Sequence, residues 1–310
     1  MGQQGWRSQW KKIKRYRALF LMMVPGLVYL FINNYLPMFG VVIAFKEVNY
    51  AKGIFGSDWV GLANFKYLFM TDDAWRITRN TILYNGSFII INTILAIAVA
   101  ILLNEIKNKL ASRFYQSVIL LPYLISMVIV GYLVLSFLNV ENGFLNKEIL
   151  PMLGIDPVSW YSEAKYWPLI LSIVNVWKNV GYLCIIYLAA IVGIDPEYYE
   201  AATIDGAGKW RQMRAITVPL LMPTIVIMTL LAIGRIFYSD FGLFYQIPLN
   251  SGPLQPATDV IDTYVYRGLM TLGDIGMSSA AGLYQSMVGF VLVLISNFMV
   301  RRKDREQALF

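Results

Sequence analysis

The fold of this chain is decided by a polar stretch, Gly193-Ile194-Asp195-Pro196-Glu197-Tyr198-Tyr199-Glu200-Ala201-Ala202-Thr203-Ile204-Asp205-Gly206-Ala207-Gly208, which stands between two long apolar runs. Asp195 precedes Pro196 and acidic residues follow, so the order predicts a short helix that Asp195 caps and whose first turn is acidic. The apolar runs on either side are long enough to cross a bilayer. A polar helix between two such runs is predicted to present a surface to a partner outside the membrane.

The composition indicates an integral membrane protein. Of the 310 residues, 57% are hydrophobic and only 15% are charged, which is too apolar for a soluble chain. The single cysteine, Cys184, excludes a disulfide framework. The absence of histidine excludes a histidine-ligated metal site and a histidine acid-base catalyst. We therefore expect no metal site and no catalytic residues on this chain.

Six apolar stretches each supply the roughly 20 residues that cross about 30 Å of hydrocarbon. The first is preceded by a long basic segment and no small-residue cleavage site follows it, which favours a retained span over a signal peptide. The prediction is an all-α membrane protein with six transmembrane helices, and an even number places both termini on one side. The predicted spans are Leu19–Phe45, Thr81–Leu103, Tyr115–Phe137, Trp167–Val192, Leu221–Phe244 and Gly282–Val300.

The distribution of Lys and Arg predicts which side that is. Sixteen of them lie in the two termini and in the loops after spans two and four, against eight on the opposite face. By the positive-inside rule, the termini and the loop at 193–220 are cytoplasmic. The net charge of +7 is thus explained by topology, and the dispersed basic residues do not form the stripe that nucleic acid would need.

The predicted organisation has three parts. Residues 1–80 hold a basic anchor at the lipid interface, the first span and an external interfacial segment in which we expect a helix within 59–69. Residues 81–300 form a core of five spans with the cytoplasmic loop at 193–220, and residues 301–310 form a basic tail.

A nucleotide site on the chain is not expected. Gly206-Ala207-Gly208-Lys209-Trp210 superficially resembles the end of a phosphate-binding loop. However, Thr203 stands where that pattern needs its first glycine, and Trp210 stands where it needs Ser or Thr.

The loop also carries a family signature. Glu200-Ala201-Ala202, followed by Gly206 and then by Ile216, Val218 and Pro219, resembles the cytoplasmic EAA loop of binding-protein-dependent ABC importer permeases. The family pattern ends in Ile-x-Leu-Pro, so Val218 is an apolar replacement of the leucine. The position of the loop between spans four and five also matches that family, whose members have the type I importer permease fold.

Further motifs narrow the resemblance to the polysaccharide or multi-sugar branch of carbohydrate permeases. They are Gly193-Ile194-Asp195-Pro196-Glu197, Asp205-Gly206-Ala207, Val60-Gly61-Leu62-Ala63-Asn64-Phe65, Tyr35-Leu36-Pro37, Ile43-Ala44-Phe45-Lys46 and Val260-Ile261-Asp262-Thr263-Tyr264-Val265-Tyr266-Arg267. The resemblance implies oligosaccharide import by alternating access across a bacterial cell membrane. The implied partners are a second homologous permease, two ATPase subunits that hold ATP and Mg, and an external solute-binding protein.

By resemblance, the polar helix is a coupling helix that docks into a groove of an ATPase. Small Ala201 and Ala202 allow close approach, Gly206 permits a turn, and Pro219 starts the next element. The alternative is an ordinary capped surface helix. The predicted coupling residues are Tyr198, Tyr199, Glu200, Ala201, Ala202, Asp205, Gly206, Trp210 and Pro219.

Two cations inside the spans, Lys178 and Arg235, indicate a polar path. A charge near the bilayer centre costs at least about 2.5–3.5 kcal/mol and usually faces a cavity or a partner. Both could line a sugar cavity, or form structural ion pairs such as Arg235 with Asp240, or contact the second permease. Gly282 and Gly289 are expected to serve close helix packing. The predicted substrate-path residues are Asn175, Trp177, Lys178, Tyr182, Arg235, Tyr238, Tyr284 and Gln285.

The cargo remains open at this stage. Cations facing the path would suit an acidic oligosaccharide with uronic acid units, whereas the same architecture could carry a neutral oligosaccharide or a glycerol-phosphate compound. Two other classes stay possible on the residues alone. The chain could be a secondary transporter, or a membrane receptor or scaffold whose Glu200 loop docks a signalling protein.

Overall fold

The computed structural model describes residues 15–303, so the predicted basic anchor and most of the basic tail lie outside the described residues. Nearly all of the described chain is helical, and its two short strands pair antiparallel. The α-helices and strands are α2 (Arg17–Leu30), β1 (Lys46–Glu47), α3 (Gly53–Gly56), β2 (Asp58–Trp59), α4 (Ala63–Met70), α5 (Asp72–Asn104), α6 (Lys109–Leu124), α7 (Met127–Leu138), α8 (Leu150–Met152), α9 (Trp167–Val192), α10 (Pro196–Ile204), α11 (Lys209–Gln212), α12 (Val218–Ile233), α13 (Phe241–Gln246), α14 (Gln255–Thr258), α15 (Ile261–Met270) and α16 (Ile275–Lys303).

Five continuous helical segments are long and apolar enough to span a membrane, and a bent pair, α6 with α7, makes up to six. The five are Arg17–Phe45, Asp72–Asn104, Ala164–Val192, Lys209–Ile233 and Ile275–Arg302. They correspond in order to predicted spans one, two, four, five and six, which confirms the all-α membrane fold.

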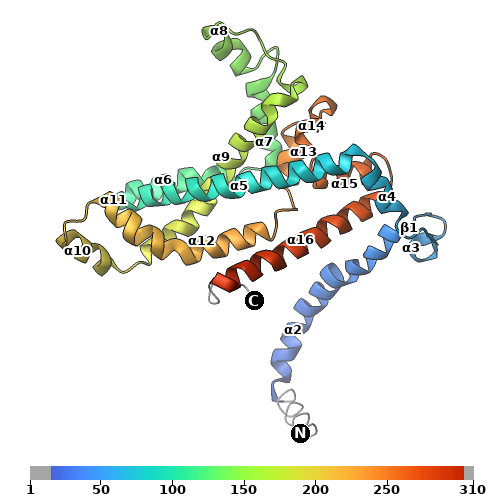
Figure 1. Ribbon diagram of the computed structural model, residues 1–310, viewed down its shortest axis with the longest axis horizontal. Helices are drawn as coiled ribbons and strands as arrows, with labels where there is room; N and C mark the ends of the chain where they lie inside the picture. The colour runs from blue at the N-terminus through green and yellow to red at the C-terminus, as the bar shows by residue number, and fades with distance from the viewer. Residues whose placement is uncertain (1–14, 304–310) are drawn as a thin grey trace.

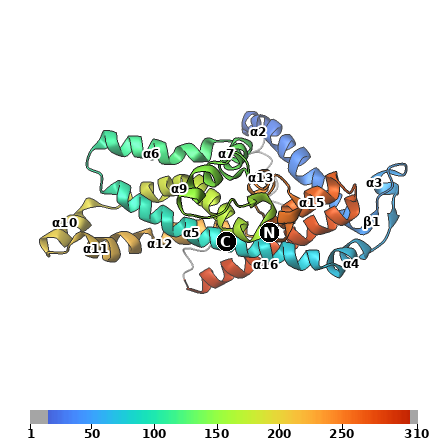
Figure 2. The same cartoon turned by 90° about the horizontal axis from the view of Figure 1, so that it is seen from above.

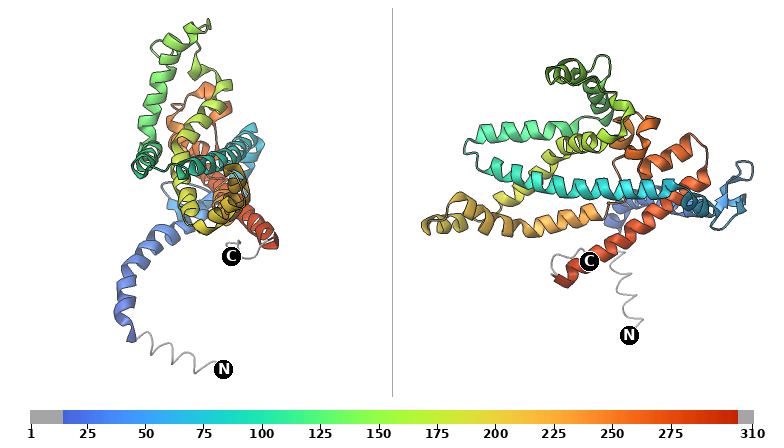
Figure 3. Two further views of the ribbon diagram at one scale, coloured as in Figure 1. Left: turned by 90° about the vertical axis from the view of Figure 1, so that its left-hand side faces the viewer. Right: turned by 45° about the horizontal axis from the view of Figure 1, so that its top comes forward.

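Two groups of loops lie at opposite ends of the molecule, while the segment that holds α8 projects from between them (Figure 1). Figure 1 shows α10 and α11 at one end, and β1 and α3 at the other, with α5, α12 and α16 running between them. The view from above in Figure 2 keeps the same two ends apart. Helix α2 leads away from the remaining helices (Figure 3, left), whereas its continuation, Leu36–Phe45, lies against α16. The span as a whole buries almost none of its side chains.

Helix α5 is the central helix of the core, because it packs along α9 over much of its length. In one half of the molecule, fully buried Ala96 and Ala100 of α5 lie in a cluster with Tyr187 and Ile191 of α9. Small alanine side chains permit this close approach of two helices. In the other half, larger side chains of α5 such as Phe88 pack with α13 and the start of α9.

The third span is bent, which corrects the expectation of one continuous helix over Tyr115–Phe137. Helices α6 and α7 meet at an angle of 93° across a two-residue break. Pro122 lies in the last turn of α6, where it removes a backbone donor. Ser126 caps the new helix by accepting a hydrogen bond from the Val128 amide at 3.3 Å.

The fifth span also departs from the predicted Leu221–Phe244. Its helical segment begins at Lys209 and ends at Ile233, and residues 234–240 form turns and extended backbone before α13 begins. Pro219 lies in the first turn of α12, as predicted, but a π-helical turn at Met213–Thr217 joins α11 to α12 without a break. Such a turn accommodates a residue that lacks a backbone donor.

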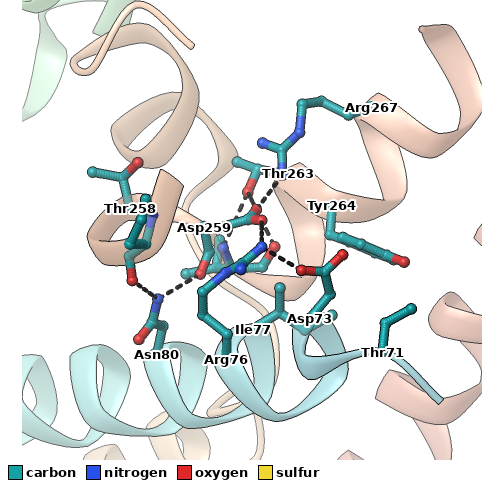
Figure 4. Close-up of polar contacts among 12 residues, drawn as sticks. Thr71, Asp73, Arg76, Ile77, Asn80, Thr258, Asp259, Thr263, Tyr264 and Arg267 are labelled. Carbon is teal, nitrogen blue, oxygen red and sulfur yellow. Dashed lines mark hydrogen bonds and ion pairs between the residues drawn. The ribbon is translucent and has the colours of Figure 1, made fainter. Parts of the chain in front are cut away.

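A buried ion cluster fastens the elements at the β1 end to α5 (Figure 4). Asp259, which is 1% exposed, accepts from Arg267 at 2.5 Å and from Arg76 at 3.5 Å. Arg76 also pairs with Asp73 at 2.6 Å, and the Asn80 amide donates to the Asp259 carbonyl oxygen at 2.9 Å. These contacts hold the chain between α14 and α15 against the first turns of α5.

Candidate functional site

The polar stretch forms the predicted capped helix. Asp195 precedes α10 and accepts a hydrogen bond from the Glu197 amide at 3.0 Å, and Pro196 is the first helical residue. After the helix, Gly206 adopts a φ of +74°, a left-handed conformation that residues with a side chain resist. The chain then turns back into α11, so α10 and α11 form a compact helical hairpin.

Side-chain hydrogen bonds inside this hairpin make it rigid. Buried Gln212 donates to the Thr203 hydroxyl and to the Ala207 carbonyl oxygen, each at 2.9 Å. The Tyr199 hydroxyl bonds to that of Thr217 at 3.0 Å. Tyr199, which is half-buried, therefore ties α10 to the π-helical turn at Met213–Thr217.

The outer face of the hairpin carries both polar and large apolar side chains. Tyr198, Ile204 and Trp210 are 58%, 86% and 81% exposed. Large apolar side chains with this exposure in a polar segment are typical of surfaces that contact another protein. Ile204 was missed by sequence reasoning, although it lies between predicted coupling residues. The predicted residues Glu200, Ala201 and Asp205 are also exposed, and Ala202 is half-buried.

A cavity of about 350 Å³ lies among α5, α6, α9, α12 and the irregular segment 234–240. Four predicted substrate-path residues, Asn175, Tyr182, Arg235 and Tyr238, line it. The remaining lining residues are Asn85, Phe88, Ile89, Asn92, Thr93, Tyr123, Asn179, Leu183, Tyr187, Met228, Ala232, Ile236 and Asp240. The wall therefore combines carboxamides, aromatic rings and one charge of each sign.

The carboxamides of the cavity are organised by hydrogen bonds. Asn92 of α5 donates to the Asn175 side chain of α9 at 2.8 Å, and Asn179 donates to the Asn175 carbonyl oxygen at 3.0 Å. Asn85 donates to the Ile236 carbonyl oxygen at 2.7 Å. Sequence reasoning missed Asn85, Asn92 and Asn179. Their spacing was a usable signal, because 85 and 92, and 175 and 179, lie on one face of their helices.

Aromatic rings form another part of the wall. Tyr123 of α6 and Tyr182 of α9 stack with ring centroids 4.6 Å apart and planes 12° apart. Tyr238 extends from the irregular segment, and its hydroxyl bonds to that of Ser286 at 3.0 Å. Exposed ring faces of this kind suit the apolar faces of sugar rings.

Arg235 brings a cation to the cavity that the described chain does not neutralise. Asp240 also lines the cavity, but across residues 15–303 Arg235 forms no ion pair with it or with any other carboxylate. The structural ion pair that the sequence left open is therefore not formed.

Lys178 has different surroundings. It is 8% exposed, does not line the cavity, and donates to the carbonyl oxygens of Pro122, Tyr123 and Ile125 at the end of α6. The sequence left two roles open for Lys178 within this chain, which were lining a sugar cavity and forming an ion pair with a carboxylate. Lys178 has neither role, because it binds backbone carbonyl oxygens.

The other predicted path residues lie outside the lining of this cavity. Trp177 is 45% exposed on α9, and the Tyr284 hydroxyl bonds to that of Thr78 at 3.3 Å. Gln285 is buried and donates to the Phe237 carbonyl oxygen at 2.5 Å and to the Asp262 carboxylate at 3.2 Å. It supports the irregular backbone behind the cavity.

Comparison with known proteins assigns the family. Residues 92–305 match the family described as binding-protein-dependent transport system inner membrane component. The chain belongs to this family. It is therefore a permease subunit of a transport system and not an enzyme, as the EAA loop predicted. The predicted resemblance to carbohydrate permeases is also confirmed by the relatives that match.

Two relatives from Bacillus subtilis (strain 168) and one solved structure are similar over nearly the whole chain. Protein LplB is 36% identical, over 95% of this chain and 92% of LplB. The polygalacturonan/rhamnogalacturonan transport system permease protein YteP is 34% identical, over 95% of this chain and 91% of YteP. The structure of a bacterial ABC transporter involved in the import of the acidic polysaccharide alginate matches with a TM-score of 0.87 and 32% identity, over 95% of this chain and 99% of that chain. The match supports the ABC importer permease fold.

Proposed function

We propose that this chain is the permease subunit of an ATP-driven importer whose cargo is an acidic oligosaccharide. The observation that carries the proposal is Arg235, a cation without a carboxylate partner in the described chain, beside carboxamides and stacked tyrosines. Carboxamides bond sugar hydroxyls, ring faces cover the apolar faces of sugars, and a guanidinium binds a carboxylate with paired hydrogen bonds. An unneutralised cation at this depth would also repay its desolvation when an anionic cargo binds.

Two of the similar proteins support the same cargo class. One is a polygalacturonan/rhamnogalacturonan permease, and the solved transporter imports an acidic polysaccharide. Both share about a third of their residues with this chain over nearly its full length. We infer that the cargo of this importer contains uronic acid units.

The hairpin of α10 and α11 is the proposed coupling element. It is rigid, it stands at one end of the molecule, and it exposes Glu200 between Tyr198 and Ile204. ATP and Mg would bind to two separate ATPase subunits, and closure of these subunits would push the hairpin and switch the cavity between the two sides of the membrane.

Two further partners complete the proposed assembly. A second homologous permease would pack on the first span, whose side chains are almost entirely unburied within this chain. An external solute-binding protein, implied by the family description, would deliver the cargo at the β1 end. The assembly would lie in the cell membrane of a bacterium, with both termini in the cytoplasm because the basic residues concentrate on that side.

The proposal is tested by neutralising the cavity cation. Arg235→Gln in the assembled importer is expected to slow uptake of tri-galacturonate by about tenfold or more, because a hydrogen bond to a charged group contributes about 1.5–3 kcal/mol. Uptake of the methyl-esterified trisaccharide, which has the same rings without charge, should change far less. The measurement is the ratio of the two uptake rates in proteoliposomes with saturating binding protein, relative to the wild-type ratio.

Arg79→Gln is the matched control, since Arg79 is exposed and does not line the cavity. It should leave the ratio unchanged. If Arg235→Gln reduces uptake of both sugars by the same factor, Arg235 does not recognise a carboxylate and the acidic cargo is refuted.

A further inference from the structure

The bend between α6 and α7 creates an electrostatic problem within the membrane. Helix α6 ends at Leu124 and α7 leaves at 93°, so the last carbonyl oxygens of α6 are not followed by a further helical turn, although that of Pro122 accepts from the Ile125 amide at 3.2 Å. Hydrocarbon offers no water for such groups, and each unsatisfied carbonyl is costly there. A polar partner must therefore come from a neighbouring helix.

Lys178 of α9 is that partner. Its ammonium group donates to the carbonyl oxygens of Pro122, Tyr123 and Ile125. An ammonium group has three N–H donors, so all of them are used by the bend. A helix also carries partial negative charge at its C-terminal end, which favours a cation at this position and removes the need for a carboxylate.

The same face of α9 brings the two helices into direct contact. Gly181, one turn after Lys178, lies so close to α6 that a Cβ atom there would be 2.0 Å from the Ile119 carbonyl oxygen. No side chain fits in that space. The contact at Gly181 and the hydrogen bonds of Lys178 thus fix the end of α6 on α9 at two neighbouring points.

Tyr123 belongs to the segment that is fixed in this way. Its carbonyl oxygen accepts from Lys178 while its ring stacks on Tyr182, which follows Gly181 in α9, and both rings line the cavity. We infer that Lys178 is a positioning residue: it holds the α6–α7 bend and thereby places the Tyr123–Tyr182 ring pair where a sugar ring binds. The role of the ring pair rests on the proposed function.

The two intramembrane cations should differ in their effect on cargo selection. Lys178 has no N–H left for a cargo carboxylate, so it acts on every sugar through the rings. Arg235 faces the cavity and would act on charged sugars. Removing Lys178 should therefore reduce uptake without changing the preference between acidic and neutral cargo.

The test is Lys178→Met, which keeps an unbranched side chain, one atom shorter, and removes its charge and donors. Uptake of tri-galacturonate and of its methyl ester should fall by the same factor, roughly tenfold, because misplaced binding groups carry penalties of this size or more. Lys178→Met combined with Tyr123→Ala should cost little more than Tyr123→Ala alone, since one substitution acts through the other. Lys178→Arg, which keeps charge and donors, should restore much of the rate.

Selective loss of the acidic sugar in Lys178→Met, or losses that multiply in the double variant, would overturn the inference. If Lys178→Met does not assemble with its partners, Lys178→Gln is measured instead. It keeps two N–H donors without the charge, so uptake of both sugars should again fall by one common factor, smaller than tenfold.

A second measurement is independent of cargo. Photo-oxidation of the purified importer should join Tyr123 to Tyr182 as dityrosine. The amount of this cross-link is the part of the dityrosine signal that is lost when Tyr182→Phe is introduced. In Lys178→Met that part should disappear, and its persistence would show that Lys178 does not position the rings. A wild-type importer that carries neither sugar would refute the proposed function while leaving this outcome intact.

Discussion

Glu200 is an exposed carboxylate in the middle of α10, and it has no role inside the hairpin. The bonds that stabilise the hairpin come from Gln212, Thr203 and the Tyr199–Thr217 pair. A substitution at Glu200 can therefore alter contact with a partner without unfolding the element. This separation makes Glu200 a sharper probe of coupling than Tyr199, whose removal would also loosen the hairpin.

We expect Glu200→Lys to abolish ATP-dependent transport and to leave membrane insertion intact, because the charge is inverted on the proposed docking surface. Insertion is measured as the amount of chain in the membrane, and coupling as uptake and copurification of the ATPase. Glu197→Lys makes the same charge change one turn earlier on the helix and serves as the control. Normal transport by Glu200→Lys would exclude the carboxylate from coupling.

Residue roles inside the membrane could be predicted only in part. Hydropathy placed Lys178 and Arg235 within spans, and the cost of a buried charge required a partner for each. The partner of Lys178 depends on where α6 ends, and that end is set by Pro122 and by the contact at Gly181. Such carbonyl partners exist only once the chain is bent, so no pattern of side chains indicated them.

At the scale of elements, the interruption of the fifth span is held by three other helices. Asn85 of α5 donates to the Ile236 carbonyl oxygen, Gln285 of α16 donates to that of Phe237, and Asp262 of α15 accepts from the Ser239 amide at 2.8 Å. Non-helical backbone at membrane depth needs such partners. The interruption is thus a specified part of the fold that shapes one wall of the cavity.

Gln285→Met removes a donor from both Phe237 and Asp262, so we expect destabilisation of about 1–3 kcal/mol at neutral pH. Burial raises the pKa of the Asp262 carboxyl above its ordinary value. The stabilisation associated with this raised pKa is complete below about pH 4 and is lost as pH rises through the folded-state value. The donor from Gln285 stabilises the ionised carboxylate, so its loss should cost more above that value than below it.

Thermal unfolding of the purified complex at several pH values checks this difference. Part of the destabilisation caused by Gln285→Met should persist at acid pH, because the Phe237 carbonyl oxygen loses its donor at every pH. Gln116→Met, in which a half-buried glutamine of α6 is replaced, is the matched control and should show little pH dependence. A cost for Gln285→Met that is larger in acid would contradict the proposed role of Asp262.

The elements themselves were predictable where apolar length alone decides them. The five continuous spans and the bent α6–α7 pair each coincide with a predicted span, and Asp195 and Gly206 correctly marked the limits of α10. The two interruptions were not found, because apolar residues continue on both sides of each of them. Pro122 and Gly234 were the available signals. Gly282, expected at a close helix contact, has no neighbour within 4 Å of its would-be Cβ in the described chain.

At the scale of the whole molecule, two loops that were predicted on the same side of the membrane lie together. The loop after α5 and the α10–α11 hairpin meet at one end, where Lys209 pairs with Glu105 at 3.0 Å. The β1–β2 pair lies at the opposite end (Figure 1). The structure sets these two ends apart, and the side of the membrane on which each lies rests on the distribution of basic residues.

Cysteine labelling tests that assignment. In a Cys184→Ala background, the only native cysteine, which is buried, is removed. A membrane-impermeant maleimide applied to right-side-out vesicles is expected to label Ala51→Cys, because this exposed residue lies at the β1 end. Ile204→Cys, 86% exposed on the hairpin, should react only after the vesicles are permeabilised. The vesicles should lack the ATPase subunits, because a docked ATPase would cover Ile204 and mimic protection by the membrane. The opposite pattern would place the hairpin outside, where no ATP is available to drive it.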